Sequence, residues 1–302
     1  MEFRKLGSLE VSVVGVGCNN FGWRTDATGT AAVVDAALDA GVNFFDTADV
    51  YGSGQSEEFL GRALKGRRDK AIIATKFGMK MGEGQEGARP EYIRWALDAS
   101  LKRLKTDTID LYQIHRPDAN TPIADTMQAL NEAVKAGKVR EIGCSNFSAE
   151  QMRAARAVPG PRWFASVQNN FSLLKREAEE DVLPECARTG VCFLPYFPLA
   201  NGLLTGKYRK GQPFPEFSRG KDAFGPKMFT AENLERVEAL IAFAESRRHS
   251  LLALAFSWLA AKPQICSVIA GAKTADQVRA NSGAVSWKLS PADLAEIDRI
   301  VG

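Results

Sequence analysis

Residues 31–47 read AAVVDAALDAGVNFFDT, and the pattern of this stretch decides the fold. The segment 31–40 repeats apolar side chains at helical spacing. Gly41 follows, at the place where a helix commonly ends on a residue with a left-handed backbone. The next segment, 43–47, is short and centred on Phe44 and Phe45, and it predicts a strand. A helix, a glycine and a strand in this order form one step of a β/α repeat.

The same alternation continues along the chain. The strand candidates are 13–17, 43–47, 71–76, 109–115, 139–145, 165–169, 191–196 and 266–270. The helical patterns between them are 31–40, 56–64, 90–104, 124–136, 149–157, 175–188, 234–255 (broken near Ser250) and 274–283. Gly41, Gly137 and Gly190 follow three of these helices. Ser56, with two glutamates behind it, suits the start of another.

Strict alternation of strands and helices predicts a parallel sheet with right-handed crossovers, and eight units favour a closed (β/α)8 TIM barrel of the α/β class. Segments 3–6 and 9–11 predict an N-terminal β-hairpin that plugs the barrel bottom, and 291–300 predicts an extra C-terminal helix. We therefore expect one barrel domain over residues 1–302. The competing Rossmann fold is not favoured, because the stretch GVGCNN at 15–20 has Asn20 where its fingerprint needs a third glycine.

Composition argues against several classes of protein. The net charge of +3 comes without a dense basic stripe, so we expect no nucleic-acid partner. The most apolar segment, 251–261, is shorter than the roughly 20 residues that cross a bilayer, and the N-terminus lacks the apolar run of a signal peptide. The five cysteines form no CxxC pair, and only His115 and His249 could join them, so we expect no metal site. This odd, scattered set favours reduced thiols in the cytoplasm over a disulfide framework.

Ionisable residues stand at the strand ends, where the catalytic groups of a (β/α)8 barrel lie. Asp46 ends the second strand, Lys76 the third and His115 the fourth. Neighbouring strands are about 4.8 Å apart, so Asp46 and Lys76 can pair and Tyr51, in the next loop, can reach back to them. Taken alone, Asp46 could cap a loop, Lys76 could be a rim charge and His115 could be a structural hydrogen-bonding residue. Their order along three consecutive strands favours a catalytic site.

Reduction of a carbonyl group needs side chains of these types. A hydride that reaches the carbonyl carbon leaves negative charge on the oxygen, which must receive a proton or a hydrogen bond. A tyrosine has an ordinary pKa of about 10. A nearby ammonium favours the phenolate, so we expect Lys76 to lower the pKa of Tyr51 and ease proton transfer at neutral pH. Asp46 would keep Lys76 charged and in position, and His115 could donate a hydrogen bond to the same oxygen.

With these residues in place, the sequence resembles the aldo-keto reductase family. The motifs that carry the resemblance are GVNFFDTA (41–48) with YG (51–52), TK (75–76), DLYQIH (110–115), IGCSNF (142–147), QN (168–169), PYFPL (195–199), GLLTGK (202–207) and GAK (271–273) with Gln277 and Asn281. The similarity runs in order from Phe3 to about Ile300. Each motif alone is weakly specific, whereas the ordered set is highly specific.

The resemblance implies a catalytic tetrad of Asp46, Tyr51, Lys76 and His115, with Tyr51 as the general acid, and it implies a nicotinamide cofactor. The cofactor contacts it implies are Ser145, Asn146, Gln168, Tyr196, Phe197, Pro198, Leu199, Gly202, Leu204, Gly206, Lys207, Gly271, Lys273, Gln277 and Asn281. Within this set, Ser145, Asn146 and Gln168 hold the carboxamide, Tyr196 stacks on the ring, and 202–207 covers the pyrophosphate. The side chains suit these tasks, because amides offer both donor and acceptor and an aromatic face holds a flat ring. The alternative is that Ser145 and Asn146 only shape a turn and Tyr196 lies in the core.

Cofactor choice depends on residues 271–281. A helix starts near Thr274, so Lys273 and free backbone N–H groups would face an anion there. This arrangement favours the extra phosphate of NADP(H), which we expect to be preferred over NAD(H). The chain has Ala280 where many relatives carry an acid, and Arg279 should face away from the cofactor.

We expect the substrate pocket to be lined by Phe21, Trp23, Tyr51, Phe77 and the long loop 203–229. This aromatic lining favours apolar or aromatic carbonyl compounds over phosphorylated sugars. Two alternatives remain open: an NADP-dependent dehydrogenase of sugars or polyols, and a non-enzymatic regulatory subunit that senses NADP. The intact set of four catalytic residues argues against the second.

Overall fold

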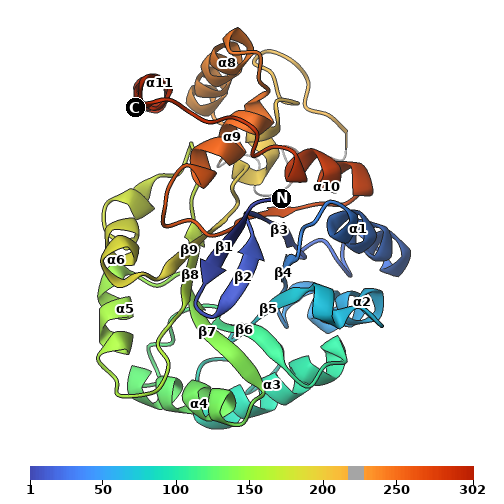
Figure 1. The fold of residues 1–302 in the computed structure, drawn as a ribbon, viewed down its shortest axis with the longest axis vertical. Helices are drawn as coiled ribbons and strands as arrows, with labels where there is room; N and C mark the ends of the chain where they lie inside the picture. Colours follow the sequence, from blue (N-terminus) through green and yellow to red (C-terminus); the bar gives the residue numbers. More distant parts are fainter. Residues whose placement is uncertain (217–227) are drawn as a thin grey trace.

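The computed structural model describes residues 1–216 and 228–302. Eight parallel strands form one sheet in the order β10-β3-β4-β5-β6-β7-β8-β9, which curls into a nearly closed barrel inside a ring of helices (Figure 1). The strands are β3 (Val14–Gly17), β4 (Phe44–Asp46), β5 (Ile72–Phe77), β6 (Ile109–Ile114), β7 (Val139–Ser145), β8 (Ser166–Asn170), β9 (Cys192–Tyr196) and β10 (Val268–Gly271). All eight strand candidates are confirmed, and the fold is the expected (β/α)8 barrel.

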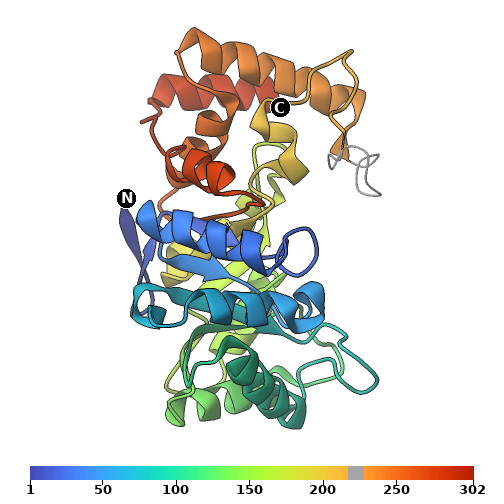
Figure 2. The ribbon, with the colours of Figure 1, turned by 90° about the vertical axis from the view of Figure 1, so that its right-hand side faces the viewer.

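The helices also follow the expected order. They are α1 (Ala27–Asp39), α2 (Gln55–Ala63), α3 (Pro90–Leu104), α4 (Ile123–Lys135), α5 (Ala149–Arg156), α6 (Val182–Thr189), α8 (Ala231–Ser246), α9 (Leu251–Ala260), α10 (Ala275–Ser282) and α11 (Pro291–Val301). Short 3-10 turns occupy Tyr51–Gly54, Arg68–Lys70, Glu177–Glu179 and Ala200–Thr205. The added helix α11 packs against α8, and Figure 2 shows both at the end of the molecule away from α3 and α4. Among the described residues, no helix is long and apolar enough to span a membrane.

Two helix boundaries confirm the chemistry expected at helix ends. The segment 234–255 breaks at Ser250, whose side chain accepts from the backbone N–H of Ala253 and starts α9. Gly190, at the end of α6, has a φ of 73°, a left-handed conformation that glycine adopts without steric cost.

Other boundaries differ from the prediction. Ser56 does not cap α2, because Gly54 stands at the N-cap position and Ser56 is the buried second residue of the helix. Its hydroxyl donates to the Cys18 carbonyl at 2.9 Å and pairs with the Thr47 hydroxyl at 2.8 Å, which fastens α2 to the barrel. The predicted helix 175–188 is two elements, a 3-10 turn and α6.

The N-terminal hairpin closes one end of the barrel, as expected. Strands β1 (Phe3–Leu6) and β2 (Leu9–Ser12) pair antiparallel and lie across the barrel strands in Figure 1. Leu6, Leu9 and Val11 are buried in a core cluster of their own. Their barrel partners in this cluster are Phe44, Ala74, Leu111, Cys192, Leu194, Cys266 and Ile269. Because most of these residues lie in the N-terminal halves of their strands, the hairpin plugs the bottom and leaves the opposite end for the site.

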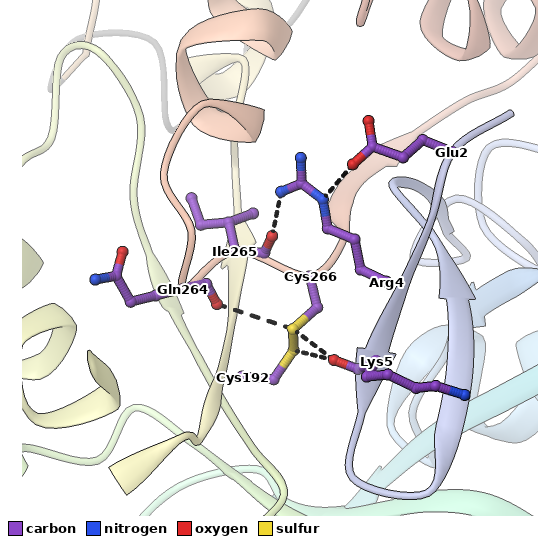
Figure 3. Close-up of a disulfide and its surroundings, with 7 residues drawn as sticks. All are labelled: Glu2, Arg4, Lys5, Cys192, Gln264, Ile265 and Cys266. Atoms are coloured by element: carbon purple, nitrogen blue, oxygen red, sulfur yellow. Dashed lines mark hydrogen bonds and ion pairs between the residues drawn. A yellow bond between two sulfur atoms is a disulfide. The ribbon is translucent and has the colours of Figure 1, made fainter. Parts of the chain in front are cut away.

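The barrel seam between β9 and β10 carries an unexpected disulfide. Among the described residues these strands share no ladder; β9 instead forms a single bridge, between Phe193 and Ile265, which lies three residues before β10. Cys192 and Cys266 are joined across the bottom of this seam, with Cα atoms 5.8 Å apart, beside strand β1 (Figure 3). The expectation that all cysteines are free thiols is therefore wrong for this pair. Sequence spacing could not reveal the pair, because closure of the barrel brings together two residues that are 74 positions apart.

Candidate active site

The predicted catalytic residues meet at the C-terminal end of the barrel. Pairing between β4 and β5 sets Asp46 opposite Ala74, and pairing between β5 and β6 sets Lys76 opposite Gln113. The ladder continues past β4, because the backbone N–H of Asp49 donates to the Lys76 carbonyl at 3.1 Å. The next turn begins at Tyr51 and is thereby held above the strand ends.

The turn that carries Tyr51 depends on a glycine. Gly52 has a φ of 56°, and a Cβ added to it would lie 3.1 Å from the backbone of Gly22. A side chain at residue 52 would therefore meet both a strained backbone and the loop that follows β3. This close approach keeps the turn folded over the barrel mouth.

Lys76 connects two of the other residues predicted to be catalytic. Its ammonium donates to Oδ2 of Asp46 at 2.6 Å, to the Thr47 carbonyl at 2.9 Å and to the Tyr51 hydroxyl at 3.4 Å. Lys76 is fully buried and Asp46 is 3% exposed, whereas Tyr51 is half-buried. Asp46, Tyr51 and Lys76 thus form one connected group, as the sequence predicted.

The electrostatic effect on Tyr51 differs from the expectation. Burial alone would lower the pKa of Lys76, but Asp46 and Tyr51 outweigh burial and raise it above its ordinary value. Lys76 is therefore charged. Burial raises the pKa of Tyr51, Lys76 lowers it, and the result lies above the ordinary value. The predicted net lowering is wrong, because removal of the phenol from water outweighs the nearby cation.

His115 lies beside this group as a neutral ring. Its imidazole meets the Tyr51 ring edge-on, with the ring centroids 5.9 Å apart. Burial, with help from Lys76 and Arg116, lowers the pKa of His115 to about 2. Nδ1 is buried without a hydrogen-bond partner in the described part of the chain. At neutral pH the ring is uncharged and carries one N–H, so it can donate a hydrogen bond but does not supply a positive charge.

Two buried amides hold the other oxygen of Asp46. Oδ1 accepts from Nε2 of Gln168 at 2.9 Å and from Nε2 of Gln113 at 3.2 Å. Gln168 was predicted as a cofactor contact, whereas Gln113 was not singled out. Its position two residues before His115 on β6 was the available signal, because alternate residues of a strand face the same side.

A chain of polar groups runs along the ends of β7 and β8. The Ser145 hydroxyl donates to the Gln168 carbonyl at 2.7 Å, and Nδ2 of Asn146 donates to the His115 carbonyl at 2.9 Å. The Tyr196 hydroxyl donates to Oδ1 of Asn146 at 2.8 Å. The structure thus brings together the four residues expected around a nicotinamide. Their side chains offer donors, acceptors and an aromatic ring at one place, which is what an amide-bearing flat ring needs.

The residues expected around the phosphates lie on two segments. One follows β9, where Phe197 is exposed, Pro198 and Leu199 come next, and the 3-10 turn Ala200–Thr205 holds Gly202 and the buried Leu204. Gly206 ends this turn with a φ of 83°, and the Lys207 ammonium lies 5.0 Å from the Tyr208 ring centre. The other segment follows β10 and spans residues 271–281.

Residues 271–281 partly correct the expectation of free backbone donors. Gly271 and Lys273 are exposed and precede α10, whereas Asn281 is buried within it. The backbone N–H of Lys273, however, donates to Oε1 of Gln277 at 2.8 Å, and the Gln277 N–H donates to the Thr274 hydroxyl at 3.3 Å. Two of the backbone donors near the start of α10 are therefore occupied, while the exposed positive charge of Lys273 stays available to an anion.

The predicted substrate residues fall in different places. Phe21 and Phe77 are fully buried in the main core, and Phe77 stacks on Tyr112. Trp23 is 62% exposed, with the Arg24 guanidinium 4.2 Å from its ring centre. Residues 217–227 of the loop 203–229 lie outside the described residues. The assignment of these aromatic residues to a substrate pocket stays a prediction.

Asp49 is a second residue that the sequence reasoning missed. It lies two positions before Tyr51, is 1% exposed, and neither carboxylate oxygen has a hydrogen-bond partner among the described residues. Burial and the nearby Glu57 raise its pKa to about 7. The sequence pattern gives no signal for this, because an Asp after a strand end is ordinarily a solvated loop residue.

Comparison with known proteins supports the resemblance to the aldo-keto reductase family. A model of the aldo/keto reductase family matches residues 13–301. The chain is 37% identical to the aldo-keto reductase YhdN of Bacillus subtilis (100% of this chain, 94% of that protein) and 37% identical to the aldo-keto reductase yakc [NADP(+)] of Schizosaccharomyces pombe (97% and 89%). The solved structure of the glycerol dehydrogenase AKR11B4 from Gluconobacter oxydans superposes with a TM-score of 0.87 at 33% identity, over 99% of this chain and 94% of that one.

The fold, the strand-end site and these similarities define an oxidoreductase built on a (β/α)8 barrel. The chain belongs to the aldo/keto reductase family.

Proposed function

We propose that this protein reduces aldehydes or ketones to alcohols with NADP(H), and that Tyr51 is the general acid. The observation that carries the proposal is the buried contact of Lys76 with both Asp46 and the Tyr51 hydroxyl. An ion pair with a purely structural role would not require a tyrosine hydroxyl next to the ammonium. The neutral His115 next to Tyr51 adds a second hydrogen-bond donor.

The raised pKa of Tyr51 suits a proton donor, because the phenol stays protonated at neutral pH. A nicotinamide cofactor, when bound, supplies the hydride. Tyr51 gives its proton to the carbonyl oxygen as charge develops there, and Lys76 stabilises the phenolate that is left. Asp46 keeps Lys76 in place, and the N–H of His115 orients the carbonyl oxygen.

The residues around the site fit a nicotinamide cofactor. Ser145, Asn146, Gln168 and Tyr196 would hold the carboxamide and the ring, and the segment 202–207 would cover the pyrophosphate. Lys273 would favour NADP(H) over NAD(H) through the extra phosphate. The name of the relative from Schizosaccharomyces pombe, which includes NADP(+), agrees with this preference.

A polyol dehydrogenase is the second candidate, since the superposed structure from Gluconobacter oxydans is a glycerol dehydrogenase. The same residues serve oxidation in reverse: the Tyr51 phenolate, stabilised by Lys76, removes the proton of the alcohol. The raised pKa of Tyr51 keeps the phenol protonated at neutral pH, so the rate of alcohol oxidation should increase as the pH rises.

The deciding experiment is a spectrophotometric screen of the purified protein. NADPH consumption would be followed with aldehydes, ketones, quinones and keto-sugars, and NADP⁺ reduction with glycerol and other polyols. We expect the highest kcat/KM with an aldehyde or ketone. Turnover of polyols alone would favour the second candidate. Cofactor binding without any turnover would indicate an NADP-sensing regulatory subunit.

The cytoplasmic location expected from the sequence stays a prediction.

A further inference from the structure

Gln113 is fully buried, yet only one end of its amide has a partner. Nε2 donates to Oδ1 of Asp46 at 3.2 Å, whereas Oε1 has no hydrogen-bond partner within the described residues. A buried carbonyl oxygen without a partner costs free energy that a leucine of similar size would avoid. The contact with Asp46 is therefore the feature that offsets this cost.

The charge of Asp46 fixes which way both amides point. A carboxylate oxygen only accepts hydrogen bonds, so Gln113 and Gln168 must each turn Nε2 toward Asp46. Oδ2 of Asp46 is occupied by the Lys76 ammonium at 2.6 Å, and Oδ1 receives the two amides. The carboxylate is thus held on both oxygens and cannot rotate away from Lys76 without breaking these bonds.

The neighbouring strands also keep the Gln113 side chain in place. A Cβ added to Gly143, its partner across the β6–β7 ladder, would lie 3.1 Å from Cγ of Gln113 and 2.5 Å from Oγ of Ser166. The space above Gly143 is therefore already filled by these two side chains. Gln113 lies on β6 between β5 and β7 and is fully buried, so its side chain is packed on both sides, which suits a residue that holds a neighbour in place.

We propose that Gln113 is a positioning residue that fixes the Asp46 carboxylate on Lys76 and so sets the geometry of the Lys76–Tyr51 pair. The inference deepens the proposed function and rests on it. Gln168 makes the same contact from β8 and is also expected to meet the cofactor, whereas Gln113 is deeper in the barrel and serves Asp46 alone. Gln113 acts through Asp46 and does not touch the substrate.

The first test measures unfolding free energies of the apoprotein by denaturant titration. The variants are Gln113→Leu, Asp46→Asn and the double variant, which together form a double-mutant cycle. We expect the effects to be non-additive, because the charge-assisted bond that Gln113 makes is already weakened in Asp46→Asn. Ser166→Ala is the matched control, since it changes a side chain that also packs over Gly143 and its hydroxyl has no partner. It should leave the stability close to that of the wild type.

The second test uses the kinetics of carbonyl reduction in the same variants. Gln113→Leu should lower kcat on the order of tenfold, which corresponds to about 1.4 kcal/mol, and should change kcat much less in the Asp46→Asn background. The dissociation constant of NADPH, measured by fluorescence, should stay unchanged in Gln113→Leu and rise in Gln168→Leu.

Additive free energies in the stability cycle would overturn the contact between Gln113 and Asp46. A kcat loss of the same size in both backgrounds would overturn the positioning role, because Gln113 would then act independently of Asp46. If the wild type reduces no carbonyl compound, the proposed function fails and with it the positioning role, while the stability cycle still decides whether Gln113 holds Asp46.

Discussion

The Lys76 ammonium lies 2.6 Å from Oδ2 of Asp46, and both side chains are withdrawn from solvent. Removing two charges from water is costly, so a buried ion pair is weak evidence for stability alone. Here the ammonium also donates to the Tyr51 hydroxyl at 3.4 Å, which places a fixed positive charge beside the one half-buried phenol of the group. The pair is therefore best understood through what it does to Tyr51.

The first prediction concerns the proton donor. Tyr51→Phe removes the hydroxyl and keeps the ring that packs against His115, so the cofactor should still bind. Carbonyl reduction should fall by about 10²–10⁴-fold, the usual effect of losing a general acid. Steady-state kinetics together with NADPH titration by fluorescence would measure both quantities. Near-normal turnover in this variant would exclude Tyr51 from the role.

The second prediction concerns the pH profile. Lys76 lowers the pKa of Tyr51 against the larger effect of burial, so Lys76→Met should raise that pKa further. Oxidation of an alcohol needs the phenolate, and its rate should therefore rise with pH at a higher midpoint in the variant than in the wild type. Reduction needs the phenol, and its decline at high pH should move upward in the same way.

The measurement is kcat/KM in both directions between about pH 6 and 11, with circular dichroism to confirm that the variant folds, because Asp46 loses its buried partner. If the profile keeps its midpoint and only its height changes, Lys76 positions Tyr51 and does not tune its proton affinity.

The fold could be predicted from the sequence because the residue pattern of each segment indicates locally whether it forms a strand or a helix. The run 191–196, for example, is apolar and follows Gly190, and β9 (Cys192–Tyr196) has nearly the same ends in the structure. The proximity of Asp46, Tyr51 and Lys76 could also be predicted, since a barrel places the strand ends at one rim. These are properties of short segments and of a single topology.

The features that escaped prediction depend on contacts between distant segments. The disulfide between Cys192 and Cys266 forms because the barrel closes. The role of Gln113 depends on its hydrogen bond to Asp46, which lies 67 residues away in the chain. The raised pKa of Tyr51 follows from how much water the neighbouring side chains exclude, which no spacing of residues encodes. Features that depend on burial or on contacts between distant strands could therefore not be predicted from the sequence.

The third prediction concerns Asp49 and the stability of the fold. Burial and the nearby Glu57 raise the pKa of Asp49 to about 7 in the folded protein, above the ordinary 3.8, while the nearby backbone N–H of Val50, Arg103 and Lys76 oppose the shift. The folded state therefore binds a proton more tightly than the unfolded state. The stability that Asp49 permits is fully present below about pH 4 and is lost as the pH rises to about 7.

Asp49→Asn resembles the protonated acid and should raise the stability above pH 7, by up to a few kcal/mol at about 1.4 kcal/mol for each pKa unit, with little effect near pH 4. Thermal unfolding at pH 4.5, 6, 7.5 and 9 would follow the difference. Asp107→Asn, an exposed aspartate, is the control and should show no such trend. A difference that does not grow with pH would show that Asp49 is already ionised at little cost.

The last prediction concerns the choice between the two nicotinamide cofactors and rests on Lys273. Lys273 is exposed just before α10, and no carboxylate lies within ion-pair distance of it among the described residues. Its backbone N–H is occupied by Gln277, so Lys273 can attract the extra phosphate of NADP(H) only through its ammonium. One charge-assisted contact at an exposed position is worth about 1.5 kcal/mol, or about tenfold in affinity. We therefore expect NADPH to bind about tenfold more tightly than NADH, and this preference to shrink at high salt because exposed charges are screened.

Lys273→Ala should remove most of the preference by weakening NADPH alone. Arg279→Ala is the matched control, because Arg279 is a nearby exposed cation whose guanidinium is paired with Asp276 at 2.7 Å. It should leave the ratio of the two dissociation constants unchanged. Fluorescence titrations of the three proteins with both cofactors, at low and high salt, measure all of these ratios. Equal affinities in the wild type, or the same ratio in Lys273→Ala, would remove Lys273 from the phosphate site, since a cation that binds the phosphate must change NADPH affinity more than NADH affinity.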